Sequence, residues 1–199
     1  MNKGILYIFI FTLGILLLFV ANLFLGSVSI PYNAILDILL GNKVEKEAWT
    51  YIIIDSRIPQ AVTALFTGGA IAVSGLLLQT AFRNPLADAG ILGISAGANL
   101  GVALVILLLG GTVGSVAGFD LSYSLSIVAG AFIGATVILV IIMGFASIIK
   151  NSVMLLIIGI MVGYLTSSII SILKFWSTSE DAYSFMLWGM GNFAGVARE

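Results

Sequence analysis

The sequence predicts an all-α integral membrane protein, and three observations support this fold class. Of its 199 residues 60% are hydrophobic and only 9% are charged, whereas about 25% of the residues in a soluble domain are charged. The mean hydropathy of the chain is +1.20. Several apolar runs are about 20 residues long, enough to cross a hydrocarbon core of about 30 Å. We therefore expect one membrane domain, residues 1–199, built as a bundle of about five transmembrane helices.

Composition also argues against several function classes. The chain has no cysteine and no histidine, which removes disulfides, thiolate metal sites and the side chain that most often acts as acid or base near neutral pH. The net charge is -1, so no basic surface suggests nucleic acid as a partner. No GxxxxGK[ST] phosphate-binding loop is present. We expect no catalytic residue, no metal site and no cofactor bound by this chain.

The first predicted span covers residues 5–25 and follows Lys3. It is longer than the apolar core of a secretory signal, which is about 7–15 residues, although an uncleaved signal remains the alternative. Pro31 suits a helix start, and a short helix at the membrane interface is expected from Ala34 to Leu40, ending at Gly41.

The second and third predicted spans, residues 58–82 and 86–109, flank a polar break. Pro59 suits the first turn of the second span, where its missing N–H is harmless. In the break, Asn84 can cap the third span and Pro85 suits its first position. With the N-terminus inside, this turn is expected on the inner side, where it fixes the connection between the two spans; contact with substrate is the alternative. The inner-turn residues are Arg83, Asn84, Pro85 and Asp88.

The fourth and fifth predicted spans, residues 123–149 and 153–175, are joined by a short turn in which Asn151 or Ser152 caps the fifth span. A glycine-rich loop, residues 110–121, precedes the fourth span. After the fifth span, Ser177 and Glu180 have capping-box spacing, which predicts a short amphipathic helix from about Glu180 to Trp188 that ends at Gly189.

Small residues recur four apart, which places them on one helix face. Such rows favour close helix packing in lipid. For the row in the third span, the lining of a polar pathway is the alternative. The packing residues are Gly93, Gly97 and Gly101 in the third span, and Gly130 and Gly134 in the fourth. If the N-terminus is inside the cell, the short inner segments carry basic residues at a higher density than the outer segments do. We therefore expect the N-terminus inside.

Several motifs in the sequence together match those of a known family of membrane proteins. The sequence resembles the FecCD-like permeases, the membrane subunits of ATP-binding-cassette (ABC) importers for iron–siderophore complexes, haem and cobalamin. The resemblance covers nearly the whole chain, most clearly from Arg57 onward. Its motifs are Arg57–Pro59, Gly75–Gln79, Phe82–Asp88, Leu92–Gly93, Ser95–Ala98, Ser177–Ser179 and Trp188–Gly191.

The resemblance implies a type II ABC importer permease fold of about ten helices, of which this sequence would be the N-terminal half. A truncated gene product, a cloned fragment and a split permease are all compatible with that length. The implied partners are ABC ATPase subunits, an external substrate-binding protein and a second permease copy in a homodimer, in the bilayer of the cell membrane. ATPase activity is expected on a separate chain, and this chain is not expected to transport alone.

The resemblance also assigns residues to roles. Docking of the binding protein is implied for Arg57 and Gln60 at the outer start of the second span, and for Glu180 and Asp181 in the short outer helix. The family typically has arginine at both of the first two positions, and only Arg57 is retained here. An arginine that reaches toward the membrane interface is the alternative interpretation of Arg57.

The fifth span lines the central pathway in this family, and its inner turn narrows that pathway as a gate. The implied pathway residues are Gly159, Met161, Gly163, Thr166 and Ser167, and the implied gate residues are Asn151 and Ser152. Helix packing is the alternative for the glycines and Met161. The expected cargo is a ferric siderophore or haem, with cobalamin as the alternative.

Two rival functions remain. One is an ATP-independent channel or ion-coupled carrier, against which the absence of charged residues in the middle of the spans argues. The other is a non-transporting membrane fragment that only associates with helices of another chain.

Overall fold

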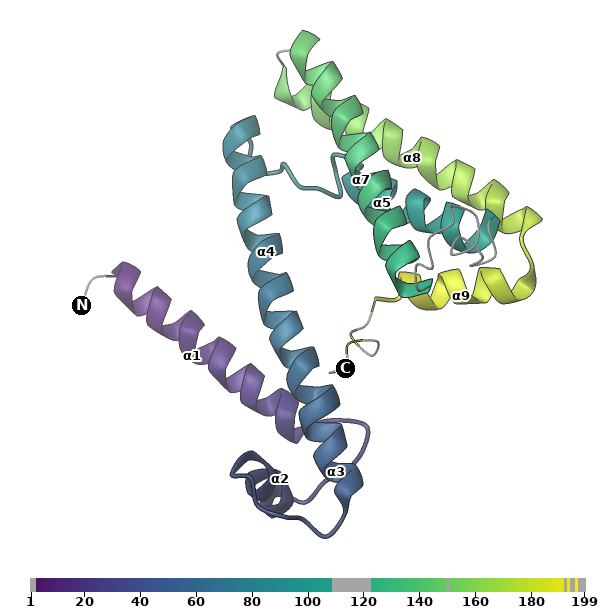
Figure 1. The fold of residues 1–199 in the computed structure, drawn as a ribbon. Helices are drawn as coiled ribbons and strands as arrows, with labels where there is room; N and C mark the ends of the chain where they lie inside the picture. Colours follow the sequence, from purple (N-terminus) through teal and green to yellow (C-terminus); the bar gives the residue numbers. More distant parts are fainter. Residues whose placement is uncertain (1–2, 109–122, 150, 192, 194–195, 197–199) are drawn as a thin grey trace. The chain divides into compact units, whose positions relative to one another are not determined.

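The computed structural model describes residues 3–108, 123–149, 151–191, 193 and 196, and over these ranges it contains helices and no strands (Figure 1). The chain divides into two compact units, residues 1–70 with 192–199 and residues 71–191. The helices are α1 Lys3–Phe24, α2 Tyr32–Leu39, α3 Glu47–Tyr51, η1 Ile52–Arg57, α4 Ile58–Phe82, α5 Ile94–Ala103, η2 Leu104–Leu108, α7 Tyr123–Ile148, α8 Ser152–Trp176 and α9 Ser179–Gly189.

Four of the described helices are long and apolar enough to cross a membrane. They are Lys3–Phe24, Glu47–Phe82, Tyr123–Ile148 and Ser152–Trp176, with 22, 36, 26 and 25 residues. Most of their large apolar side chains are exposed, for example Phe66 and Phe132, each at 73%. Exposed apolar surface on this scale is what a lipid or a partner helix covers, so the fold is that of a membrane protein.

The third predicted span starts later than its sequence suggests. It was expected from residue 86, but the described helix runs over Ile94–Leu108. The Asn84 side chain accepts a hydrogen bond from the Leu86 N–H at 3.0 Å, and Asp88 accepts one from the Gly90 N–H at 2.7 Å. These local bonds hold residues 84–90 in turns, so Asn84 closes a turn and does not cap a helix at Pro85.

Helix α4 ends before this turn with the paired bonds of a Schellman motif. The Arg83 N–H donates to the Thr80 carbonyl at 3.2 Å, and the Asn84 N–H donates to the Gln79 carbonyl at 3.1 Å. Arg83 has a φ of +48°, and it is the only non-glycine residue with positive φ in the described part of the chain. The motif requires that conformation, so the reversal of the chain is set at Arg83.

In the unit of residues 1–70, the second span is longer than predicted. Helices α3, η1 and α4 are continuous over Glu47–Phe82, so Pro59 lies inside a helix and not in its first turn. Segment η1 is a π-helix in which the Ile58 N–H donates to the Ile53 carbonyl. This wider turn lets the helix continue past Pro59, which has no N–H to donate.

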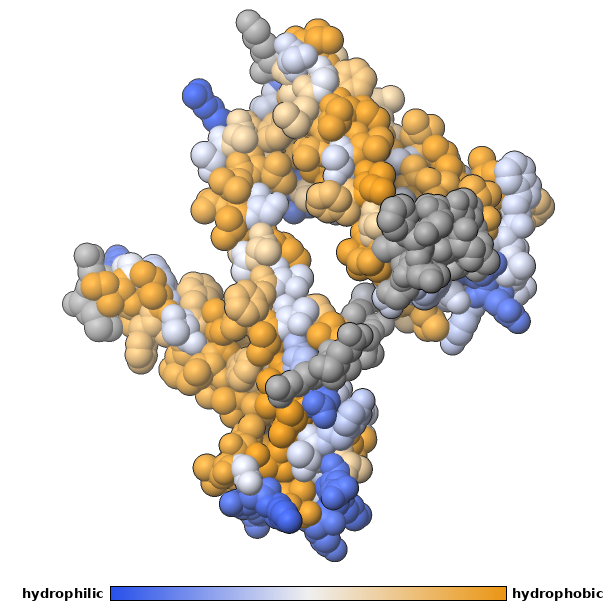
Figure 2. Space-filling model, in the orientation of Figure 1, coloured by the Kyte–Doolittle hydropathy of each residue, from blue (hydrophilic) through white to orange (hydrophobic). Residues whose placement is uncertain are grey.

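A small apolar cluster holds α2 against η1 in the same unit. Ile30, Ile35, Ile38 and Ile53 are buried together. Helix α2 ends at Leu39, and Gly41 with a φ of +79° closes it. Figure 2 shows hydrophobic residues over α1 and α4 and hydrophilic residues around α2 and α3. This distribution fits a short helix at the membrane surface.

In the unit of residues 71–191, helices α5, α7, α8 and α9 lie together (Figure 1). With η2 they pack around two apolar clusters. One cluster joins η2, α8 and α9 through Ile106, Leu173 and Phe185. The other joins the turn after α4 to α7 and α8 through Leu92, Ile142 and Leu156. Helix α5 contacts α7, α8 and α9 and therefore lies at the centre of this unit.

The cap of α9 lies one residue beyond the predicted one. Thr178, not Ser177, is the N-cap: its hydroxyl accepts from the Asp181 N–H at 3.2 Å and donates to the Asp181 carboxylate at 2.7 Å. The helix begins at Ser179 and includes Gly189. Residues 177–179 all carry hydroxyl groups, so the sequence alone does not show which of them is the N-cap.

Candidate functional site

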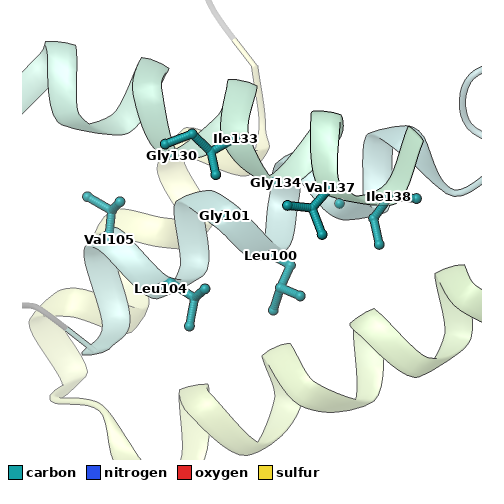
Figure 3. A pocket seen from close by; sticks show the side chains of 10 residues that line it. Leu100, Gly101, Leu104, Val105, Gly130, Ile133, Gly134, Val137 and Ile138 are labelled. Atoms are coloured by element: carbon teal, nitrogen blue, oxygen red, sulfur yellow. The ribbon is translucent and has the colours of Figure 1, made fainter. Parts of the chain in front are cut away.

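The glycines of α5 and α7 form a contact between the two main chains. A Cβ atom added to Gly101 would collide with the Gly130 carbonyl oxygen, and one added to Gly134 would collide with the Gly97 carbonyl oxygen. Figure 3 shows Gly101 directly facing Gly130 and Gly134. Two helices can approach this closely only where side chains are absent, so these four glycines serve packing in this structure.

A groove of about 280 Å³ runs along the same contact (Figure 3). Glycines and aliphatic side chains line it, among them Leu104, Val105, Ile133 and Val137. Leu104 and Ile133 are 40% and 61% exposed. A groove of this character offers a fit for apolar groups and no polar anchor.

Gly93 does not share the face of Gly97 and Gly101, contrary to the prediction. It has a φ of +77° and is the N-cap of α5. A Cβ at Gly93 would lie 2.8 Å from the Gly159 carbonyl oxygen, and a Cβ at Gly159 would lie 2.7 Å from the Ile91 oxygen. The left-handed turn at Gly93 directs residues 91–93 against α8, because it precedes the first helical turn.

The five predicted pathway residues lie on two different faces of α8. Gly159 and Thr166 are buried. Gly159 lies against Ile91 and Leu92, and Gly163 faces Ala96 of α5. The Thr166 hydroxyl donates to the Val162 and Gly163 carbonyls at 3.1 and 2.8 Å. Met161 is 64% exposed and Ser167 is also exposed. One pathway cannot be lined by both faces. Gly159 packs against the chain in this structure, in line with the packing alternative for the glycines, and the pathway role of the other residues stays a prediction.

The exposed face of α8 contains polar residues that the sequence reasoning missed. Tyr164 is 72% exposed, and Ser168 and Ser171 are also exposed. The Ser168 hydroxyl donates to the Tyr164 carbonyl at 2.9 Å, and the Ser171 hydroxyl donates to the Ser167 carbonyl at 3.0 Å. Counting from Met161 in steps of three and four would have found this row. We call Met161, Tyr164, Ser167, Ser168 and Ser171 the open face of α8.

The predicted gate residues lie at the start of α8. Asn151 is the N-cap, and its side chain accepts from the N–H groups of Val153 at 2.9 Å and Met154 at 3.3 Å. Asn151 is exposed and Ser152 is half-buried. Of the two residues proposed as caps, Asn151 has this role. Lys150 lies outside the described residues, as does the predicted loop 110–121.

Arg57 is buried, contrary to the expectation of a docking residue that faces an external partner. It is only 6% exposed. Its guanidinium donates to the Leu23 carbonyl at 2.8 Å and to the Val28 carbonyl at 2.6 Å. Gln60, one turn later, donates to the Ser56 hydroxyl at 2.9 Å. Two of the guanidinium donors of Arg57 therefore already bond to the chain itself, and little of this side chain is exposed to a partner.

The other predicted docking residues belong to the second unit. Glu180 is exposed and Asp181 half-buried, and both lie in the first turn of α9. Acidic groups there interact favourably with the positive end of the helix dipole. Within the described residues, no group of three or more acidic side chains is placed to hold a metal ion.

Comparison with known proteins now gives the family. The model of the FecCD transport family matches residues 14–199. This chain belongs to the FecCD transport family. The hemin transport system permease protein HmuU of Yersinia pestis is 35% identical over 184 residues, which cover 90% of this chain and 52% of that protein. The vitamin B12 import system permease protein BtuC of Salmonella paratyphi A is 36% identical over 140 residues, covering 70% and 40%.

A solved structure described as an inward-facing conformation of a metal-chelate type ABC transporter resembles this FecCD chain. The TM-score is 0.71 at 28% identity, over 95% of this chain and 54% of that chain. The FecCD chain spans about half the length of the curated relatives it matches. The match supports the all-α permease fold predicted from sequence.

Proposed function

We propose that this FecCD chain supplies part of the membrane pathway of an ATP-driven importer for metal chelates. The observation that carries the proposal is the family match over residues 14–199, together with the likeness to a metal-chelate type ABC transporter. In this proposal an external binding protein delivers the chelate, and ATPase subunits on separate chains drive opening and closing. A second permease copy completes the pathway, and the N-terminus lies inside the cell.

The open face of α8 is the proposed lining of that pathway. Its serine hydroxyls at 168 and 171 already donate to main-chain carbonyls, so they offer a polar but weakly binding surface. A transported molecule must enter and leave, which strong binding would prevent. The turn at Asn151 and Ser152 is the proposed inner gate, because it begins the same helix.

The proposed cargo is chelated iron, as haem or a ferric siderophore. HmuU is named for hemin and matches 90% of this chain. The open face of α8 has no charged residue, which suits a metal that already has its full set of ligands. Cobalamin is the second candidate, because BtuC is named for vitamin B12 and is 36% identical over 140 residues.

An uptake assay tests the cargo. The permease that carries these 199 residues would be produced with its ATPase and binding protein in cells that lack their own haem, siderophore and cobalamin uptake. We expect ATP-dependent uptake of haem or a ferric siderophore, with excess cobalamin causing no competition. Uptake of cobalamin alone would favour the second candidate, and uptake that survives an inactive ATPase would contradict an ATP-driven importer.

A further inference from the structure

Arg57 is a buried cation whose two hydrogen-bond partners are main-chain carbonyls of the same unit. It is 6% exposed and bonds to the carbonyls of Leu23 and Val28. Taking a guanidinium out of water is costly unless its donors are paired. These bonds span 34 and 29 residues of sequence, so Arg57 ties the end of the first span to the second.

The carbonyl of Leu23 is in the last turn of α1, which ends at Phe24. The last four carbonyls of a helix have no donor within that helix, and this end of the helix dipole is negative. The Leu25 N–H satisfies the Ala21 carbonyl at 2.8 Å, and Arg57 satisfies the Leu23 carbonyl. Arg57 therefore caps α1 from another helix.

Gly26 gives independent support, because the guanidinium lies against its main chain. A Cβ at Gly26 would lie 2.5 Å from Arg57 Nη2, 2.7 Å from Cζ and 2.8 Å from Nε. No other residue fits at position 26 unless Arg57 moves. The glycine and the arginine are thus matched to each other.

The π-helical turn η1 sets the position of Arg57. Ile53, Arg57 and Ala61 are spaced four apart and are all buried, at 0%, 6% and 5% exposure. In an α-helix, side chains four residues apart differ in direction by about 40° around the helix axis. The π turn has more residues per turn, which reduces this difference. The turn therefore directs Arg57 to the same side as Ile53, which packs with Ile30 and Ile35.

We propose that Arg57 is an internal clasp, which fixes the end of α1 and residues 25–28 to the helix Glu47–Phe82. The clasp stabilises the segment between the first two spans as a preformed surface. Its relevance to a binding protein rests on the proposed function above. The clasp itself can be measured without any partner.

Cysteine labelling tests the clasp directly, because the chain has no cysteine of its own. A single Leu23→Cys substitution places a thiol at a site that is 6% exposed. Its reaction with a small maleimide would be followed in membranes for the otherwise unchanged chain and with Arg57→Gln, Arg57→Lys or Gly26→Ala added. Two matched controls are Lys43→Gln, an exposed cation of the same unit, and Gly14→Ala, where a Cβ meets nothing within 4 Å.

We expect Arg57→Gln and Gly26→Ala each to speed labelling about tenfold, equal to about 1.4 kcal/mol of local opening. Arg57→Lys should lie between, because an ammonium lacks the planar fork of donors. Both controls should leave the rate unchanged. Unchanged rates in Arg57→Gln and Gly26→Ala would overturn the clasp.

A second thiol, Ile142→Cys in the other unit and 2% exposed, separates local opening from general unfolding. The clasp predicts that the Ile142→Cys thiol stays protected in all of these variants, and equal exposure of both thiols would contradict a local device.

If the binding protein associates with the permease, Arg57→Gln should weaken association equally at low and high salt. A loss confined to low salt with unchanged labelling would restore Arg57 as a docking charge, whereas absence of association would affect only the proposed function.

Discussion

At the scale of single residues, glycine decides where this chain packs main chain against main chain. Gly101 and Gly130 face each other so closely that either Cβ would meet the other residue's carbonyl oxygen. Gly144 lies on the same helix as Gly130, but a Cβ added there would meet nothing within 4 Å. Spacing identified Gly101 and Gly130 as packing residues. It could not distinguish positions that require glycine from positions, such as Gly144, where a larger residue would fit.

This difference gives a matched pair of substitutions. Gly101→Ala should destabilise the unit of residues 71–191 by about 1–3 kcal/mol, the usual cost of overpacking, because its Cβ collides with the Gly130 carbonyl oxygen. Gly144→Ala should be neutral or slightly stabilising, since alanine favours a helix over glycine by about 1 kcal/mol. Thermal unfolding in detergent measures both, and equal midpoints would contradict the close contact.

Single residues also explain where the structure departs from what the sequence suggested. Arg57 in sequence stands at the start of an apolar run, where an exposed role is a natural interpretation. Its burial depends on carbonyls 29 and 34 residues away, and no local pattern contains that information. Gly93 has the spacing of a helix face, but its left-handed conformation results from the turn that precedes it.

At the scale of elements, apolar length predicted the long helices well. Helices α1, α7 and α8 lie within two residues of the ranges expected from sequence. The errors are at polar and proline positions. Asn84 bonds to its own turn in place of starting a helix, and η1 carries the second span past Pro59, because local hydrogen bonds compete with helix propensity at such sites.

Helix α8 has the clearest separation of faces. Its buried face packs on residues 91–93 through Gly159 and on α5 through Gly163, whereas its open face presents Met161 and Tyr164 at 64% and 72% exposure. The open face also contains Ser167, Ser168 and Ser171, which make it more polar than the exposed side chains of α1. The separation supports the open face as the proposed pathway lining.

The start of α8 offers a test of the proposed gate. Ser152→Cys should react with an impermeant maleimide applied from the inside in some nucleotide states and be protected in others, because a gate opens and closes with the ATPase cycle. Phe175→Cys, 85% exposed near the other end of α8, serves as the control and should label at one rate in all states. State-independent labelling of Ser152→Cys would remove this turn from the gate.

At the scale of the whole molecule, the fold class and the family could be predicted from sequence, and the cargo could not. Composition and run length led to a membrane bundle, and the motifs between Arg57 and Gly191 led to the FecCD family, which matches residues 14–199. In the proposed function, cargo depends on the shape of a pathway that other chains complete. The relatives named for hemin and vitamin B12 are 35% and 36% identical to this chain, so identity does not separate the two.

The central claim is that the open face of α8 lines the pathway of an ATP-driven importer, and one pair of variants tests it most directly. Ser168→Trp would place a bulky ring on that face, whereas Val128→Trp would place the same ring on α7 at a site that is 63% exposed. ATP-dependent uptake of the chelate would be measured for both in the permease that carries these residues, produced with its ATPase and binding protein. We expect Ser168→Trp to reduce uptake at least about tenfold, equal to about 1.4 kcal/mol, with normal amounts of protein, while Val128→Trp transports normally. Equal uptake by the two variants would contradict the claim.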